Sequence, residues 1–260
     1  MNRKEQEMQF HNMREEDRSC MDEESFLKKY SNKKYYAIQR KSTEYIDGLI
    51  ERSVKGKTVL DYCCGLGAMS LQMAQKGGIV YGIDISDESV KTAEAEAKKA
   101  GVADRTNFSV MDAEELQFPD NTFDVILCSG VLHHLDLDNA YPELARVLKP
   151  GGLIICGEAL GYNPIISLYR KMTPHLRTAW EAEHILTLRD LRKAKKYFGT
   201  VKVDYFHLAS IAAVPFRNTP IFKPILSTLE AVDDVLLKIP YVQLMAWQMI
   251  FTLSDPKVAK

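Results

Sequence analysis

The chain has 260 residues, of which 46% are hydrophobic and 27% charged, and its formal net charge is −1. The length fits one large α/β domain with elaborations, and the balanced charge argues against nucleic acid as a partner. No stretch approaches the ~20 apolar residues of a membrane span, and the charged N-terminus shows no secretory pattern. The five cysteines lack metal-ligand spacing, so we expect reduced thiols, no metal and a cytoplasmic location.

The N-terminal part precedes the predicted sheet. Residues 1 to about 30 are dense in Glu, Lys, Arg and Met, which predicts a mobile or loosely helical arm. Apolar residues at helical spacing then predict a helix from Tyr35 to Arg52. We therefore expect residues 1–55 to form an N-terminal arm with helices, and residues 56–260 to form the main domain.

Strand-like and helix-like segments alternate from residue 58 to residue 158. Short apolar runs separated by helix-length patterns predict right-handed βαβ crossovers and a parallel sheet covered on both faces. Ser86, followed by two acidic residues, is typical of a helix start. The predicted strands are Thr58–Tyr62, Ile79–Asp84, Thr106–Val110, Phe123–Ser129 and Leu153–Glu158, and the predicted helices include Ala68–Lys76 and Tyr141–Leu148.

The pattern changes after Glu158. Insertions at about 160–186 and 211–245 interrupt it, and a helix over Thr187–Phe198 with strands over Thr200–His207 and Trp247–Leu253 completes the chain. The second insertion predicts an amphipathic helix over Ile221–Ile239. Its apolar face would hold Ile225, Leu229, Val232, Leu236 and Ile239, with Glu230, Asp233 and Asp234 on the opposite face.

The most informative stretch is Val59–Gly67 (VLDYCCGLG), a buried strand that runs into a glycine turn. Glycines let a backbone approach a nucleotide closely, and Asp84 ends the next strand, where a carboxylate can bind ribose hydroxyls. The dinucleotide fingerprint is incomplete because Ser70 takes the place of its third glycine. Asp61 would also oppose a pyrophosphate but suits a cation, which favours S-adenosylmethionine.

With these motifs, residues 56 to 160 resemble the class I S-adenosylmethionine-dependent methyltransferases. The resemblance implies a Rossmann-like, seven-stranded, mostly parallel sheet whose last strand is antiparallel. It also implies S-adenosyl-L-methionine as cofactor and S-adenosyl-L-homocysteine as product. The family usually has glycine where Cys63 stands. The motifs that carry the resemblance are the glycine turn, Asp84, Asp112-Ala113, Phe123–Ser129 with Val131–Leu135, and Leu148–Gly152.

The resemblance also assigns cofactor contacts residue by residue. It implies that one group holds the methionine moiety, a second the ribose and a third the adenine, and that a serine after the fourth strand lies near the sulfonium. These residues are Asp61, Cys63, Gly65 and Gly67; Asp84 and Ile85; Asp112 and Ala113; and Ser129.

The implied reaction is an in-line displacement that methylates an oxygen, nitrogen or carbon of a small-molecule acceptor, hydrophobic or anionic in character. His133 and His134 are the candidate catalytic residues, because imidazole can accept a proton near neutral pH; alternatively they cap their loop. Relatives place an N-terminal lid near Tyr36, which could contact the acceptor. Arg170, Arg177 and His184 could bind a carboxylate or phosphate, or form a solvated surface.

Other functions stay open. They are an RNA- or protein-modifying methyltransferase, a dinucleotide oxidoreductase, and a non-catalytic member that binds cofactor and serves as a partner. The basic stretch Arg189–Lys202 has few aromatic residues, which favours a solvated helix over an RNA-binding one. The acidic residues of the helix over Ile221–Ile239 argue against membrane binding. We expect that helix to pack on the sheet edge or on another subunit, the latter in a homodimer.

Overall fold

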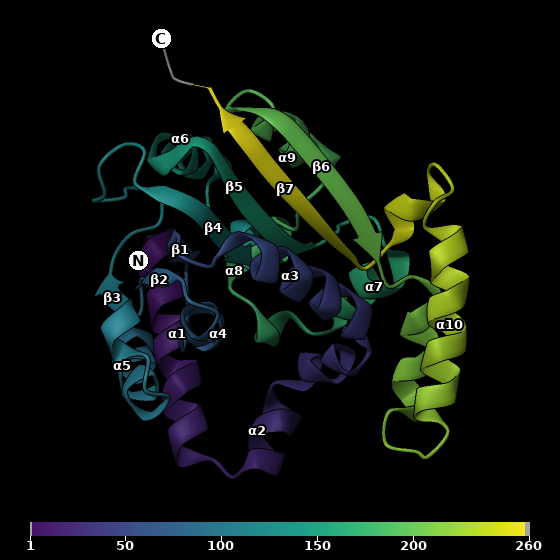
Figure 1. Cartoon of the computed structure of the whole chain (residues 1–260). Coiled ribbons are helices and arrows are strands. Elements are labelled where there is room, and N and C mark those ends of the chain that lie inside the picture. Colours follow the sequence, from purple (N-terminus) through teal and green to yellow (C-terminus); the bar gives the residue numbers. More distant parts are fainter. Residues whose placement is uncertain (1, 258–260) are drawn as a thin grey trace.

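The computed structural model describes residues 2–257. Seven strands form one sheet in the order β3-β2-β1-β4-β5-β7-β6 (Figure 1). The first five strands pair in parallel, and β7 runs antiparallel to both of its neighbours, which confirms the predicted fold. The strands are β1 (Thr58–Tyr62), β2 (Ile79–Asp84), β3 (Thr106–Val110), β4 (Phe123–Ser129), β5 (Leu148–Ala159), β6 (Phe198–Phe206) and β7 (Gln248–Pro256).

Helices cover both faces of this sheet. Successive side chains of a strand point to opposite faces, so Val59 packs with one buried cluster while Leu60 packs with the other. The first cluster lies under α3 (Arg40–Ser53), α4 (Ala68–Gln75) and α5 (Asp87–Lys99). The second lies under α6 (Leu137–Val147) and α9 (Leu188–Ala194). The sheet is therefore the middle layer of three.

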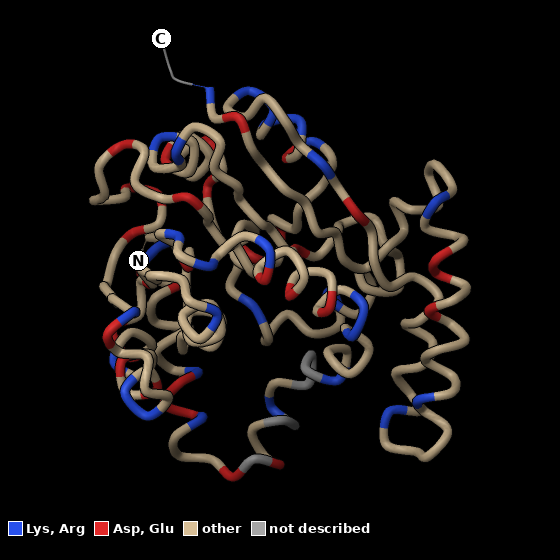
Figure 2. Tube along the Cα trace, viewed as in Figure 1, with Lys and Arg blue, Asp and Glu red and all other residues tan. Residues whose placement is uncertain are grey.

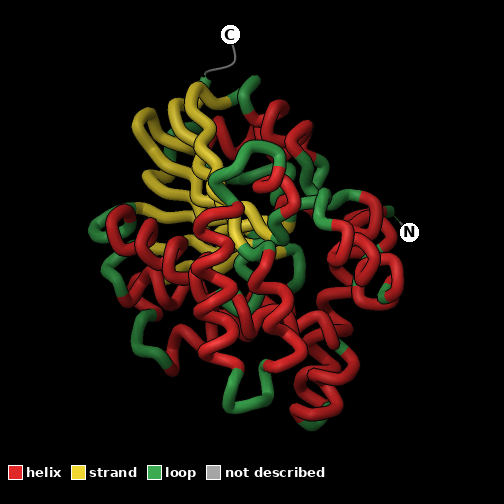
Figure 3. Tube along the Cα trace, turned by 90° about the vertical axis from the view of Figure 1, so that its right-hand side faces the viewer, coloured by secondary structure: helices red, strands yellow, loops and turns green. Residues whose placement is uncertain are grey.

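The remaining helices belong to the N-terminal part and the two insertions, and most of them gather beside one end of the strands (Figure 3). They are α1 (Arg3–Cys20), α2 (Glu23–Lys29), α7 (Pro164–Met172), α8 (Ala179–Glu183) and α10 (Phe222–Leu236). Short 3-10 helices lie at 31–38, 103–105, 132–134, 174–176, 209–216 and 242–245. No helix of residues 2–257 combines the length and the apolar character that crossing a bilayer would require.

The N-terminal segment is more regular than its composition predicts. Asn2 accepts a hydrogen bond from the backbone N–H of Glu5, and the Glu5 side chain accepts one from the backbone N–H of Asn2. This capping box starts an 18-residue helix, α1. The prediction of a mobile or loosely helical arm is wrong for this segment, because α1 makes ion pairs with the main domain that no local pattern reveals.

The predicted helix over Ile221–Ile239 is also present, as α10, but its faces are wrongly assigned. Glu230 and Asp233 are buried, whereas Val232 is 40% and Ile239 44% exposed. Glu230 forms an ion pair with Arg40, and Asp233 accepts hydrogen bonds from the backbone N–H groups of residues 208–210. These partners hold both carboxylates inward against the apolar periodicity, although Oε1 of Glu230 has no hydrogen-bond partner among the described residues.

Charged residues are interspersed over the molecule, as the net charge of −1 predicts (Figure 2). All five cysteines are free thiols, as expected for a chain whose cysteines show no paired spacing. Ser86 caps α5, and Thr187 forms a capping box with Asp190 at the start of α9. These two helix starts were readable because caps are local signals.

Candidate functional site

A cavity of about 320 Å³ lies where β1, β2, β3 and β4 end. Ligands of open α/β sheets bind outside the carboxyl ends of the strands, where the strand order reverses. That reversal occurs here between β1 and β4. Of the nine predicted cofactor residues, seven line the cavity: Cys63, Gly65, Asp84, Ile85, Asp112, Ala113 and Ser129.

The glycine turn supplies one wall of this first cavity. Gly65 has φ +52°, and a Cβ added there would meet no atom within 4 Å, so its open side can face a ligand. Cys63 holds the left-handed φ of 59° that glycine usually takes, which strains this turn. A Cβ on Gly67 would approach Ala93 to 2.9 Å. Gly67 therefore serves the close packing of α4 on α5 and does not line the cavity.

Two aspartates at strand ends hold the loops around the cavity. Asp84 accepts hydrogen bonds from the backbone N–H of Gly65 at 2.8 Å and of Ser86 at 2.9 Å. Asp112 accepts one from the backbone N–H of Glu114 at 2.9 Å and pairs with Lys4. Both carboxylates therefore shape the turns as well as line the cavity.

Asp61 lies beneath the turn rather than on the cavity wall. It is 3% exposed, and its Oδ2 accepts a hydrogen bond of 2.5 Å from the hydroxyl of Ser70. Burial raises the pKa of Asp61 to about 6, although the Ser70 hydrogen bond opposes the shift. Its predicted contact with the methionine moiety would therefore require a ligand that reaches under the turn.

Helix α1 closes the first cavity from the other side. Arg3 pairs with Glu114, Lys4 with Asp112, and Glu7 with Nδ1 of His134 at 3.0 Å. The side chains of Arg3, Lys4, Glu7, His11 and Arg14 line the cavity. Sequence reasoning missed all five, although their three- and four-residue spacing places them on one face of a helix.

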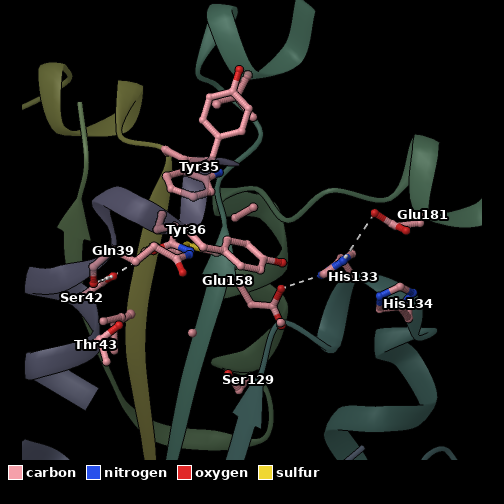
Figure 4. A pocket seen from close by; sticks show the side chains of 18 of the residues that line it. Tyr35, Tyr36, Gln39, Ser42, Thr43, Ser129, His133, His134, Glu158 and Glu181 are labelled. Carbon is pink, nitrogen blue, oxygen red and sulfur yellow. Dashed lines mark hydrogen bonds and ion pairs between the residues drawn. The ribbon is translucent and has the colours of Figure 1, made fainter. Parts of the chain in front are cut away.

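A second cavity of about 620 Å³ adjoins the first, and Figure 4 shows part of its lining. The two cavities share His11, Arg14, Ser129, Gly130 and His134. Gly130 has φ +68°, and a Cβ added to it would meet no atom within 4 Å. The cavities thus meet at the end of β4, where Ser129 and Gly130 are small, and His11, Arg14 and His134 complete the shared lining.

His133 is held at this junction by Glu158, which is 1% exposed. The Glu158 carboxylate lies 2.7 Å from Nδ1 of His133 and accepts hydrogen bonds from the backbone N–H groups of Val131 and Leu132 (Figure 4). Because a carboxylate accepts, Nδ1 carries a hydrogen, and in the neutral imidazole the lone pair is therefore on Nε2. Nε2 lies 3.9 Å from Glu181, on the side of the second cavity. The sequence offered no signal for Glu158 beyond its place at the end of a strand.

His134 has a different environment from its neighbour. Burial opposes its charged form, but the hydrogen bond with Glu7 and the carboxylates of Glu181 and Glu158 outweigh burial and raise the pKa of His134. A protonated His134 would hold α1 through Glu7 and lack a free lone pair. The two predicted catalytic histidines are thus unequal as proton acceptors.

The predicted acceptor residues separate into two groups. Tyr36, Arg170 and Arg177 line the second cavity. His184 does not; it is exposed and stacks on Trp180 with 3.5 Å between ring centroids. Sequence reasoning missed much of this lining, which comes from elements far apart in the sequence and includes Gln39, Ser42, Thr43, Trp247 and Gln248.

Comparison with known proteins identifies the central part of the chain. Residues 60–156 match the family model described as a methyltransferase domain. The chain is 41% identical over 107 residues to 27-O-demethylrifamycin SV methyltransferase from Amycolatopsis mediterranei, covering 40% of this chain and 39% of that protein. It is 32% identical over 136 residues to a ubiquinone biosynthesis O-methyltransferase from Rhizobium etli, covering 52% of this chain and 50% of that one.

Solved structures agree on the fold. The YcgJ protein from Bacillus subtilis has a TM-score of 0.54 at 20% identity, over 82% of this chain and 99% of that chain. The [4+2]-cyclase SpnF has a TM-score of 0.52 at 23% identity, over 82% of this chain and 81% of that chain. At such identities the likeness concerns the fold alone, and a fold does not fix a reaction.

The matched segments span half or less of these two curated relatives. Within that span, the family match, the curated relatives and the strand order agree. Residues 60–156 therefore match a methyltransferase domain, and the curated relatives that share this segment are methyltransferases.

Proposed function

We propose that the protein transfers a methyl group from S-adenosylmethionine to a small-molecule acceptor. The observation that carries this proposal is the junction of two cavities at Ser129 and Gly130. A donor in one cavity and an acceptor in the other would meet there, and such positioning supplies much of the acceleration of a displacement.

The residues of the first cavity suit the donor. Asp84 offers a carboxylate that could accept hydrogen bonds from ribose hydroxyls, and we propose Asp112 and Ala113 as adenine contacts because they line the same cavity. The open side of Gly65 leaves room for the methionine moiety. S-adenosylmethionine supplies an electrophilic methyl group when it is bound. The surrounding carboxylates suit a cation, and α1 would exclude water.

His133 is the better candidate for a proton acceptor. Glu158 fixes its tautomer, so that Nε2 can take a proton from an acceptor hydroxyl or amine in the second cavity. His134, whose pKa is raised, would instead hold α1 over the donor. Glu158 is a positioning residue in this scheme, because it acts through His133.

The acceptor is proposed to be a small molecule. The relatives named above act on a rifamycin and in ubiquinone biosynthesis, which supports this class but does not transfer either substrate. A cytoplasmic location, a homodimer and the absence of nucleic-acid partners stay predictions. Tyr36, Arg170 and Arg177 are proposed acceptor contacts.

Incubation with S-adenosylmethionine labelled at its methyl group, together with fractionated small metabolites, tests the proposal. We expect a labelled small product that depends on enzyme and is lost with His133→Ala. Label that appears only in RNA or protein would contradict the small-molecule acceptor. Binding of the donor without turnover on any fraction would favour the non-catalytic alternative.

A further inference from the structure

Two arginines with mostly buried side chains lie close together at the wall of the second cavity. Arg170 comes from α7, and Arg177 follows the 3-10 helix at 174–176. Their side chains are only 13% and 6% exposed, yet both line the cavity. A third arginine, Arg14 of α1, lines the same cavity. Buried guanidinium groups are uncommon unless an anion accompanies them.

The positive charge at this wall exceeds the negative charge beside it. Glu181 is the carboxylate that pairs with both arginines, at 3.6 Å from Arg170 and 3.5 Å from Arg177. Each separation is longer than a charge-assisted hydrogen bond. The other two carboxylates of the lining are engaged elsewhere: Glu158 with His133 and two backbone N–H groups, and Asp47 with the side-chain amide of Gln72. One carboxylate, that of Glu181, therefore balances the positive charge of two arginines.

Hydrogen-bond donors at this wall are also left without acceptors. Within the described residues, Nε of Arg177 and Nε of Arg14 are buried and have no hydrogen-bond partner. The other recorded bonds of Arg177 go to Thr173 and to the carbonyl of Arg170. A buried donor without an acceptor costs on the order of 1–3 kcal/mol, more when it is charged. Burial and the neighbouring Arg177 also lower the pKa of Arg170. An incoming anion would supply acceptors for these hydrogen-bond donors and would offset the repulsion between the two arginines.

We propose that the second cavity binds a carboxylate or phosphate group of the acceptor through Arg170 and Arg177. This inference rests on the proposed function of that cavity as the acceptor site. Planar guanidinium groups bind such anions in a bidentate manner. Aromatic rings line the same cavity: Tyr35 lies 4.9 Å from Tyr169 and 5.7 Å from Trp247, measured between ring centroids. The acceptor therefore combines an apolar body with an anionic group.

Binding of three matched probes tests this assignment. Benzoate, phenyl phosphate and the neutral benzyl alcohol share one ring and differ in charge and geometry. We expect benzoate or phenyl phosphate to bind the full-length protein at least tenfold more tightly than benzyl alcohol, with or without S-adenosylhomocysteine. Whichever of these two anions binds more tightly shows whether the site prefers a carboxylate or a phosphate. Equal binding of all three probes would overturn the assignment, and this comparison needs no variant.

Variants then locate the site. Arg170→Gln is expected to weaken anion binding at least tenfold. Arg177→Lys keeps the positive charge but loses the planar guanidinium group that binds an anion in a bidentate manner, so we expect it to weaken binding less. Arg189→Gln, on an exposed position of α9, is the matched control and should bind as the wild type does. Unchanged binding by a folded Arg170→Gln protein would refute the site. Failure to bind S-adenosylhomocysteine while the anions still bind would instead count against the proposed methyl transfer.

Discussion

The carboxylate of Glu158 lies 2.7 Å from Nδ1 of His133 and accepts two further hydrogen bonds from the backbone that precedes this histidine. One buried side chain from β5 thus fixes both the loop after β4 and the tautomer of its histidine. Such a pairing leaves Nε2 as the only ring nitrogen that can accept a proton.

Glu158→Gln should therefore lower kcat more than it raises KM. A glutamine can still accept one backbone hydrogen bond, but it removes the charge that stabilises a protonated His133, and we expect kcat to fall about 10²- to 10⁴-fold. Steady-state kinetics with an identified acceptor, recorded against pH, measure this effect. Glu183→Gln, at an exposed position of α8, is the control. A pH profile and a kcat equal to those of the wild type would exclude the positioning role.

The pair of Glu7 and His134 should make the docking of α1 depend on pH. The pKa of His134 is raised, so its contribution to the stability of the docked helix is fully present below its ordinary pKa near 6.5. That contribution is lost as pH rises through the raised pKa. Since the pKa of Glu7 is lowered, its contribution holds above about 4.5 and is lost as pH falls further. Hydrogen-exchange protection factors of α1 should therefore be lower at pH 9 than at pH 6.

His134→Ala should abolish most of this difference. His175→Ala is a suitable comparison, because His175 is exposed and belongs to neither cavity. Protection factors of α1 that are the same at pH 6 and pH 9 in the wild-type protein would contradict the proposed role of the pair.

Asp61→Asn should stabilise the protein at alkaline pH. A buried carboxyl whose pKa is raised to about 6 favours the folded state when it is protonated, so wild-type stability declines as pH rises from about 4 through 6. The shift corresponds to at most about 3 kcal/mol. Urea unfolding at pH 5 and pH 8 measures the gain, with Asp104→Asn, an exposed position, as control. The idea fails if the variant is less stable than the wild type at pH 8.

Gly130→Ala should lower turnover, because it adds a side chain where the two cavities meet. Its φ of +68° strains any side chain, and the added Cβ would project into the shared space. Gly101 has the same φ and equally open surroundings, but it lies outside both cavities. Gly101→Ala should therefore cost a similar free energy of unfolding, about 1 kcal/mol, without loss of turnover. Equal turnover of the two variants would show that the junction tolerates a side chain.

Many helices and strands were predictable because the patterns that indicate them lie in neighbouring residues. The β1 strand, the turn at Gly65 and the cap at Ser86 each depend on residues adjacent in sequence. The strand order then follows from the crossover rules and from the family resemblance. The faces of α10 were not predictable, because Glu230 points inward only through its pairing with Arg40, 190 residues earlier.

The candidate site likewise has a part that the sequence predicted and a part that it did not. Asp84 and Asp112 follow strands, so motifs in the sequence predicted them as cofactor contacts, and both line the first cavity. The second cavity combines side chains of α1, α3, α7, β5 and β7, and no short motif records such long-range contacts. Arg14 was missed for that reason, whereas Arg177 was found only as one member of a polar cluster.

Calorimetric titration with S-adenosylhomocysteine tests the central claim most directly. Wild-type protein should bind one molecule per chain. Asp84→Ala should lower the affinity at least tenfold, because it removes the carboxylate proposed to hold the ribose and the partner of the Gly65 N–H. Asp104→Ala should bind as the wild type does. Absence of binding to the wild-type protein, or an affinity that Asp84→Ala leaves unchanged, would contradict the account.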